Sequence, residues 1–131
     1  MAYIIDADWI IHITRGNSRV ARIVKDLARE RVAVSWLTLG EVYEVAFNTS
    51  HPQAQLDALQ QYVHSFDVVG VDGPIMERFA ETRAFLRRRG QLISDMDIIL
   101  AATALERDLT VLTFNARHFE RIPDLRVYRA G

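Results

Sequence analysis

Short apolar segments alternate with longer segments of helical periodicity along the entire chain. Residues 2–6, 32–35, 66–71 and 110–113 have the apolar runs typical of buried strands, and residues 126–128 are a candidate for a fifth. Helices are expected over residues 9–13, 20–31, 38–48, 53–64, 74–89 and 95–107. Strands that alternate with helices predict a parallel sheet covered by helices on both faces. Because no linker, repeat or low-complexity segment interrupts the pattern, we expect one α/β domain over residues 1–131.

The composition restricts both the compartment and the chemistry. A chain of 131 residues is long enough for one domain with a core of its own. It contains no cysteine, which excludes disulfides, zinc–thiolate sites and thiol nucleophiles and favours a reducing compartment. The first strand meets an acid too early for a signal peptide, and no apolar run approaches the roughly 20 residues that span a bilayer. We therefore expect a cytoplasmic protein with no membrane partner.

The net charge of −1 argues neither for nor against a nucleic-acid partner. A protein that binds nucleic acid through charge alone is strongly basic, so this chain would have to hold phosphates locally, through metal ions and a few arginines. The arginine run at 87–89 is one candidate, although cations at the end of a helix are explained at least as well by the helix dipole. Arg15, Arg117 and Arg121 are similar candidates.

Acidic side chains stand where the expected sheet would place a functional site, beyond the carboxyl ends of its strands. Asp6 closes the first strand, and Glu41 lies in the first turn of the helix that follows the second. Asp95 and Asp97 open the helix 95–107, and Asn115 follows the fourth strand. Clustered carboxylates raise one another's pKa unless a cation intervenes, and hard oxygen ligands suit Mg²⁺ or Mn²⁺. Such a metal can activate water and neutralise charge on a phosphodiester, as in many nucleases.

Taken singly, most of these acids have an alternative explanation as helix caps. Capping-box spacing is found in two pairs, Thr38 with Glu41 and Ser94 with Asp97. Asp8 is expected to cap the helix 9–13, with metal ligation the less favoured alternative. Asp6 is harder to explain in this way, because an acid that ends an apolar strand meets no obvious local need. The prediction of a site therefore rests on the arrangement more than on any one acid.

Other polar residues give weaker indications. The four histidines lack close ligand spacing, which makes a zinc site improbable. His118 lies near Asn115 and could reach a phosphate, although packing or a backbone hydrogen bond is the favoured role. The strand-end hydroxyls of Ser35 and Thr113 could bond the site carboxylates or substrate, or equally the backbone.

At these residues the sequence resembles the PIN-domain family, and within it the VapC-type toxins of VapBC toxin–antitoxin pairs. Residues 3–8 (Tyr-Ile-Ile-Asp-Ala-Asp) resemble the opening strand with its first catalytic aspartate, and residues 35–42 resemble the segment that carries the family's glutamate. Residues 97–104 (Asp-Ile-Ile-Leu-Ala-Ala-Thr-Ala) are similar to the family's most recognisable stretch, whose leading aspartate binds metal. Residues 109–119 and 121–123 are similar to the closing segment. The last two matches together are quite specific, and the four run in order along nearly the whole chain.

The resemblance implies an α/β/α sandwich with a central parallel sheet, a divalent-metal site of acids, and hydrolysis of RNA. It places Asp6 and Asp97 as the principal metal ligands, Glu41 beside them, and Asp95 at lower weight. Many members have a fourth acid near the position of Asn115, and the neutral amide found here would weaken a second metal. A homodimer and a cognate antitoxin are the partners that the resemblance suggests.

We therefore expect an endoribonuclease that uses Mg²⁺ or Mn²⁺ and acts as the toxin of such a pair. Either Glu41 or Asp95 is a candidate for the proton acceptor. The alternatives are a nuclease of this fold in RNA maturation or DNA cleavage without a toxin role, and a non-catalytic binding module whose acids only cap helices.

Overall fold

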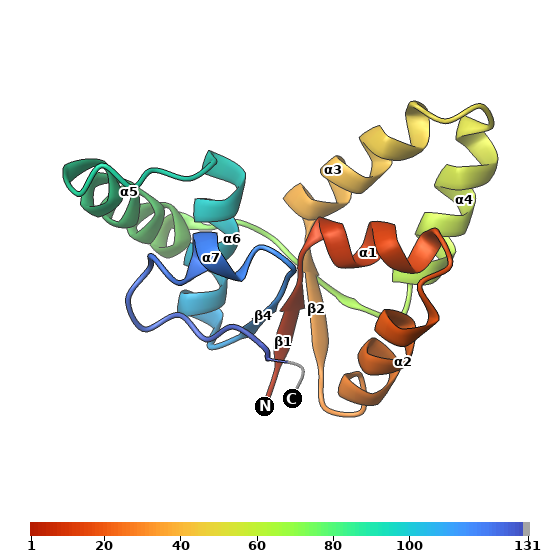
Figure 1. The fold of residues 1–131 in the computed structure, drawn as a ribbon, viewed down its shortest axis with the longest axis horizontal. Coiled ribbons are helices and arrows are strands. Elements are labelled where there is room, and N and C mark those ends of the chain that lie inside the picture. Colours follow the sequence, from red (N-terminus) through yellow and green to blue (C-terminus); the bar gives the residue numbers. More distant parts are fainter. Residues whose placement is uncertain (130–131) are drawn as a thin grey trace.

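Within residues 1–129, which a computed structural model describes, four parallel strands form one sheet in the order β3-β2-β1-β4 (Figure 1). The strands are β1 (Tyr3–Ile5), β2 (Val32–Ser35), β3 (Asp67–Val69) and β4 (Thr110–Leu112). Ile4 pairs with Ala33 on one side and with Val111 on the other, so β1 lies inside the sheet. Because every strand runs in the same direction, the residues that follow β1, β2 and β4 emerge at one edge.

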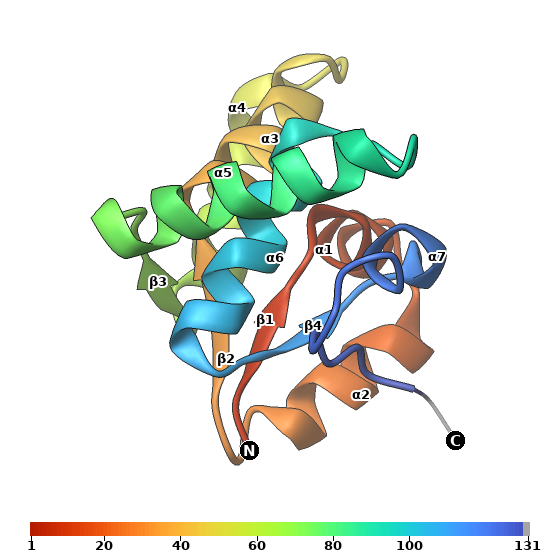
Figure 2. The same cartoon turned by 90° about the vertical axis from the view of Figure 1, so that its left-hand side faces the viewer.

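Helices cover both faces of this sheet, which confirms the α/β/α architecture. One layer consists of α1 (Ala7–Thr14), α2 (Ser18–Leu27), α3 (Trp36–Phe47) and α4 (Pro52–Val63). The opposite layer consists of α5 (Gly73–Arg88), α6 (Asp95–Arg107) and α7 (Ala116–Phe119). Figures 1 and 2 show the two layers on either side of the strands.

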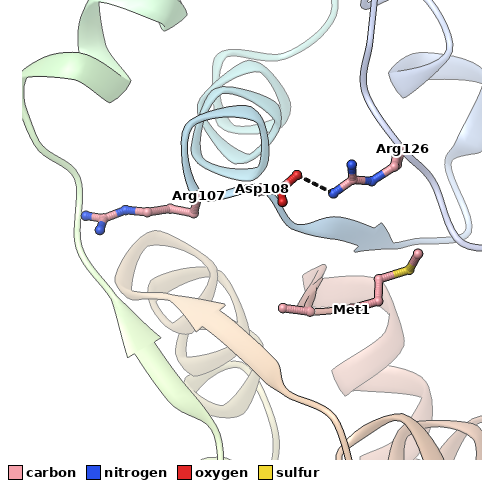
Figure 3. A pocket seen from close by; sticks show the side chains of 5 residues that line it. Met1, Arg107, Asp108 and Arg126 are labelled. Carbon is pink, nitrogen blue, oxygen red and sulfur yellow. Dashed lines mark hydrogen bonds and ion pairs between the residues drawn. The ribbon is translucent and has the colours of Figure 1, made fainter.

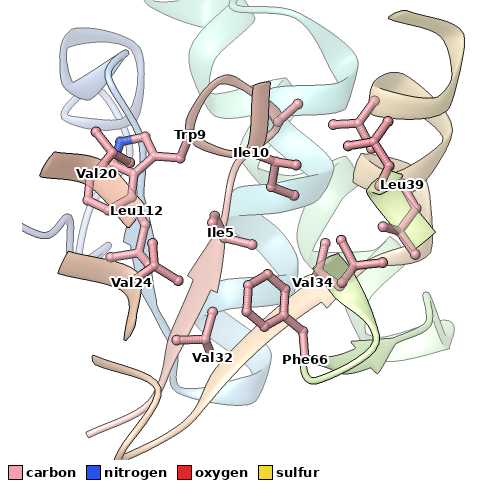
Figure 4. Close-up of a cluster of buried hydrophobic side chains, with 14 of the residues drawn as sticks. Ile5, Trp9, Ile10, Val20, Val24, Val32, Val34, Leu39, Phe66 and Leu112 are labelled. Carbon is pink, nitrogen blue, oxygen red and sulfur yellow. The ribbon is translucent and has the colours of Figure 1, made fainter. Parts of the chain in front are cut away.

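Alternation along the strands divides the buried side chains into two cores. Ile4 and Val111 face the layer that contains α5 and α6, whereas Ile5 and Leu112 face the layer that contains α1 and α3. Figure 4 shows the second of these cores, where side chains from both strands pack against Trp9. Full burial of an aliphatic side chain contributes about 1.5–3 kcal/mol, so these cores hold the strand ends firmly in place.

Two helices next to the carboxyl ends of strands, α1 and α3, begin two residues earlier than the sequence pattern indicates. Helix α1 starts at Ala7 rather than at residue 9, because Asp6 is its N-cap. Helix α3 starts at Trp36 rather than at residue 38, because the hydroxyl of Ser35 accepts a hydrogen bond from the amide of Leu37 at 3.2 Å. Both caps are the residues that immediately follow or end a strand, so chain direction changes there without a loop.

Other boundaries also differ from the expected ones. Helix α2 ends at Leu27 instead of continuing to residue 31, and β3 is shorter than the expected 66–71. The candidate fifth strand is reduced to a single parallel bridge between Val127 and Val111. Helix α7 was not expected, while α6 has the expected bounds. Gly90 ends α5 as the sequence predicts, with the positive φ of 64° that glycine adopts without strain.

None of the helices in the described part of the chain has the length and apolarity needed to cross a membrane.

Candidate functional site

Three helices that carry acidic residues begin at the carboxyl edge of the sheet. Asp6 follows β1 directly and caps α1, Glu41 lies in the second turn of α3, and Asp97 lies in the first turn of α6. Figure 1 shows α1 and α3 starting where β1 and β2 end. Three of the predicted site residues thus come from separate elements to one edge of the sheet.

The carboxylate of Asp6 is buried, and hydrogen bonds fix both of its oxygens. Its side chain is only 6% exposed. Oδ1 accepts from the amide of Ala7 at 2.8 Å, and Oδ2 accepts from the hydroxyl of Thr113 at 2.8 Å. Thr113 follows β4, the neighbour of β1, so the pairing of these two strands sets the position of the carboxylate.

Asp8 also belongs to this site, and the expectation that it caps a helix is wrong. Asp6 is the cap, which leaves Asp8 inside the first turn of α1. Its Oδ2 accepts from the amide of Phe114 at 3.0 Å and lies 3.4 Å from the hydroxyl of Thr113. Its Oδ1 is buried and has no hydrogen-bond partner among the described residues. A buried carboxylate oxygen without a donor is costly, and such atoms usually meet water or a cation.

Glu41 lies near enough to the other acids for their charges to act on it, and it does not form a capping box. Because α3 begins at Trp36, Thr38 lies inside the helix, and the capping interpretation of Glu41 is wrong. Burial raises the pKa of the half-buried Glu41 carboxyl, and the charges of Asp97 and Asp8 raise it further, followed by that of Glu44.

Burial and like charges also act on Asp6. Burial is the largest cause, and with the charges of Asp8 and Asp97 it raises the Asp6 pKa to about 7. The hydrogen bonds from Thr113 and from the amide of Ala7 oppose this rise. Burial likewise raises the pKa of Asp8, against the hydrogen bond from the Phe114 amide. We call Asp6, Asp8, Glu41 and Asp97 the acidic cluster.

Asp97 is oriented by α7. The capping role of Ser94 is confirmed, since its hydroxyl accepts from the amide of Asp97 at 3.2 Å. The Asp97 carboxylate does not complete a capping box with Ser94. It lies beside His118, whose Nδ1 is 3.3 Å from Oδ2 of Asp97. His118 therefore touches a member of the acidic cluster, a position that the short helix α7 provides.

Asp95 and Asn115 lie outside the acidic cluster. The carboxylate of Asp95 is 61% exposed and forms an ion pair with the Nε of Arg83 on α5 at 2.8 Å. Asn115 is exposed, and its side chain makes no capping hydrogen bond at α7. Its backbone amide donates to the Thr113 hydroxyl at 3.0 Å, so it supports the residue that holds Asp6.

The donor set suits a hard divalent cation. The acidic cluster offers only carboxylate oxygens, and one of them, Asp8 Oδ1, has no partner in the described part of the chain. Among residues 1–129, no three acidic or histidine side chains converge closely enough to enclose an ion by themselves. The arrangement therefore fits an ion of the Mg²⁺ type, which binds through one or two carboxylates and keeps several waters.

Sequence reasoning undervalued Asp8, and left Thr113 and His118 undecided. The spacing Asp6-Ala7-Asp8 offered a signal for Asp8, because a helix that starts directly after the strand puts its second residue beside the cap. For Thr113 and His118 the contacts depend on which strands are neighbours, which spacing along the chain does not reveal.

A hollow lies at the opposite end of the sheet from the acidic cluster. Its volume is about 600 Å³, and it is lined by residues that include Met1, Arg107, Asp108 and Arg126. Figure 3 shows Arg126 paired with Asp108 beside it. Because no member of the acidic cluster lines this hollow, it has no part in the chemistry of the cluster.

Comparison with known proteins gives one consistent family. The PIN domain family model matches residues 3–125. Ribonuclease VapC1 of Haemophilus influenzae is 23% identical over 128 residues, with 96% of each chain covered. The tRNA(fMet)-specific endonuclease VapC of Shigella flexneri is 26% identical over 126 residues, again with 96% of each covered.

Solved structures agree with the fold. The VapBC2 structure from Rickettsia felis, bound to a DNA fragment from the promoter, superposes with a TM-score of 0.91 at 19% identity and 98% coverage of both chains. The DNA-bound VapBC structure from Salmonella typhimurium has a TM-score of 0.90 at 26% identity, with 98% of this chain and 97% of that chain covered.

Proposed function

Because the chain belongs to the PIN domain family, we propose that it is a ribonuclease that hydrolyses phosphodiester bonds of RNA with the help of Mg²⁺ or Mn²⁺. Relatives that cover 96% of the chain are ribonucleases or RNA endonucleases by name. The single observation that carries the proposal is the acidic cluster, in which one carboxylate is buried and has its pKa raised to about 7 by burial and by its acidic neighbours. Such a concentration of negative charge is costly without a cation.

In this proposal Asp6 and Asp97 hold the ion, and Glu41 and Asp8 lie beside them. When bound, a divalent ion would lower the pKa of a water molecule and offset the charge of the scissile phosphate. The neutral side chain of Asn115 stands near the position where many PIN nucleases have an acid, which favours one ion over two.

The remaining roles belong to the residues of the chain. Thr113 fixes the orientation of the Asp6 carboxylate. Glu41 is the better candidate for the proton acceptor, because its raised pKa brings a carboxylate closer to the range in which a base is effective at neutral pH. Asp95 is the weaker candidate, since its carboxylate is engaged by Arg83. His118 positions Asp97 through the contact between Nδ1 and Oδ2.

We also propose the toxin role and an antitoxin partner. The support is the likeness, at 26% identity and over nearly the whole of both chains, to the toxin–antitoxin complex from Salmonella typhimurium. A homodimer remains a proposal on the basis of the family resemblance. RNA as substrate and an antitoxin as partner would both place the protein in the cytoplasm.

The test is cleavage of total RNA from the host by purified protein, free of antitoxin, with and without Mg²⁺ or Mn²⁺. New 5′ ends are mapped by sequencing. Asp97→Asn is expected to abolish the cuts and leave the fold intact by circular dichroism. Asp26→Asn is the matched control, because Asp26 is an exposed acid on α2 that does not belong to the acidic cluster.

Metal-dependent cuts at defined positions, lost in Asp97→Asn and kept in Asp26→Asn, would establish the enzyme and identify its substrate. If folded protein leaves RNA intact under all conditions but cuts single-stranded DNA, the substrate assignment is wrong. If neither is cut, the alternative of a non-catalytic binding module replaces the proposal.

A further inference from the structure

A second hollow, distinct from the one in Figure 3, lies between the end of α5 and α7. Its volume is about 510 Å³. Three arginines contribute to its wall: Arg89 just after α5, Arg117 on α7, and Arg121 just after α7. Positive side chains that gather around a hollow repel one another unless an anion or water fills the space between them.

In the described part of the chain, no carboxylate balances the charge of these three arginines. Six other arginines of the described chain form ion pairs with acids, namely Arg31, Arg78, Arg83, Arg107, Arg126 and Arg129. Within residues 1–129 no such pair joins Arg89, Arg117 or Arg121 to a carboxylate. Glu120 also lines the hollow, but its carboxylate pairs with Arg129.

Neutral groups hold two of these guanidinium groups in place. The guanidinium of Arg89 lies over the ring of Phe85, 5.2 Å from its centre, and its Nε donates to Oε1 of Gln91 at 3.4 Å. Nη1 of Arg121 donates to the backbone oxygen of Gln91 at 3.3 Å. Contacts of this kind orient a guanidinium without cancelling its charge, which is what the recognition of a phosphate requires.

The hollow in Figure 3 provides the contrast. It also has arginines in its wall, but Arg107 pairs with Asp72 and Arg126 pairs with Asp108. Its positive charge is therefore balanced from within the chain, and an anion would gain little by entering it.

Helix α7 connects the arginine hollow to the acidic cluster. Arg117 lines the hollow, and the next residue, His118, lies 3.3 Å from the carboxylate of Asp97. A strand of RNA whose reacting phosphate lies at the acidic cluster could therefore follow α7 and place another phosphate near Arg117.

We propose that the hollow lined by Arg89, Arg117 and Arg121 binds a backbone phosphate of the RNA substrate, away from the bond that is cleaved. The proposal rests on the proposed function for the identity of the ligand. The chain has a net charge of −1, and its acidic cluster repels RNA. The hollow would supply positive charge that binds the RNA backbone locally. The contact is to the backbone, so it contributes affinity and register without reading bases.

The experiment measures binding of a short fluorescein-labelled single-stranded RNA by anisotropy, in EDTA, over a series of NaCl concentrations. The double variant Arg117→Ala/Arg121→Ala is expected to bind about tenfold more weakly, since one charge-assisted contact is worth about that factor. The slope of log K against log salt is expected to fall by about 0.7, the value for one phosphate of a single strand. Arg117→Lys/Arg121→Lys should recover the slope, because it keeps the charges.

Arg19→Ala/Arg22→Ala on α2 is the matched control, since it removes the same charge from exposed positions far along the chain from the hollow. Equal loss of affinity and of slope in the two alanine pairs would overturn the proposal, because the arginines of the hollow would then act only through net charge. Arg117→Ala alone serves as a second variant if loss of the Arg121 contact to Gln91 disturbs the fold. Unchanged binding in that folded variant would also count against the site.

The failure of this proposal can be told apart from that of the proposed function. Binding in EDTA does not need cleavage, so selective loss of binding in a protein that never cuts RNA would leave the phosphate site standing and remove the enzyme. Metal-dependent cutting, together with unchanged RNA binding by the arginine variants, would support the enzyme and remove the phosphate site.

Discussion

The hydroxyl of Thr113 donates a hydrogen bond of 2.8 Å to the buried Oδ2 of Asp6, and the two residues lie 107 positions apart in the chain. The bond joins the residue that follows β1 to the residue that follows β4, the neighbouring strand. It also counteracts the burial and the charge of Asp8, which together raise the Asp6 pKa. A neutral hydroxyl thus favours ionisation of the central carboxylate against these two larger causes.

Replacement of Thr113 by valine should raise the Asp6 pKa further, because it removes the hydroxyl that favours the ionised form. Hydrogen bonds to charged groups contribute about 1.5–3 kcal/mol, so the shift should be roughly one pH unit. Cleavage should increase with pH as Asp6 loses its proton. In the variant we expect this increase to occur at a pH that is higher by the same amount. Thr110→Val is the control, because Thr110 is buried on β4 and its hydroxyl has a hydrogen bond with Arg126 and none with Asp6 among the described residues. An unchanged profile in Thr113→Val would mean that Asp6 does not limit the rate.

Asp6 should make the metal-free protein less stable as the pH rises. Its pKa is 3.8 in the unfolded reference and about 7 in the folded protein, so the unfolded chain gives up its proton first. The folded state therefore loses stability between these two values, by up to about 4 kcal/mol, and loses no more above the folded pKa. Asp6→Asn removes this loss. In urea titrations with EDTA, the variant should exceed the wild type in free energy of unfolding at about pH 8, and match it near pH 4. A difference that stays constant across this range would contradict the pKa.

A divalent ion should reverse this order. If the ion binds the ionised acidic cluster, it stabilises only the folded state, by an amount that grows with its concentration. Mn²⁺ at about pH 8 is then expected to raise the Tm of the wild type, and to raise it less near pH 5, where Asp6 is protonated. The Tm of Asp6→Asn should change little. Equal shifts in both proteins would place the ion elsewhere on the surface.

The architecture and the edge that carries the site follow from the sequence, because the periods of strands and helices differ and parallel strands share one functional edge. Helix starts are harder to predict. Asp6 and Asp8 can each cap α1, and Ser35 and Thr38 can each cap α3; the choice depends on the path of the chain as it leaves the strand. The predicted starts of α1 and α3 are both wrong for this reason. The first error gives Asp8 a capping role, and the second gives one to Glu41.

Contacts between distant elements could not be predicted. Periodicity indicates which face of a strand a residue occupies, but not that β4 lies beside β1 and brings Thr113 to Asp6. Likewise, the spacing of Asp95 and Asp97 places them on different sides of the helix, but it does not reveal that one side meets Arg83 and the other meets His118. Helix α5 packs beside α6 and supplies the cation that Asp95 meets, which depends on how the two helices lie in the fold.

Asp8→Asn should reduce cleavage by at least about tenfold and lower the Asp6 pKa, because it removes the largest charge that opposes ionisation of Asp6. The asparagine oxygen can still accept from the Phe114 amide, so the fold should be kept. Activity measured against pH at saturating Mn²⁺ provides both readouts. Asp57→Asn is the control, as Asp57 is an acid on α4 that contacts Gln53. If Asp8→Asn lowers only the Tm and leaves activity intact, Asp8 has a purely structural role in α1.

Asp95 and Asp97, two positions apart on the same helix, should respond differently to the same substitution. Asp95→Asn breaks an exposed ion pair with Arg83, which costs at most about 1 kcal/mol, and should retain cleavage within a few fold of the wild type. Asp97→Asn removes a member of the acidic cluster and should leave no measurable cleavage at the same metal concentration. Arg83→Gln breaks the ion pair from the other side and frees the Asp95 carboxylate, so its activity reports whether that acid can act when it is released. If Asp95→Asn is as inactive as Asp97→Asn while Arg83→Gln remains active, the reaction needs the Asp95 carboxylate but not its ion pair with Arg83, and Asp95 would then rank above Glu41 as the candidate for the proton acceptor.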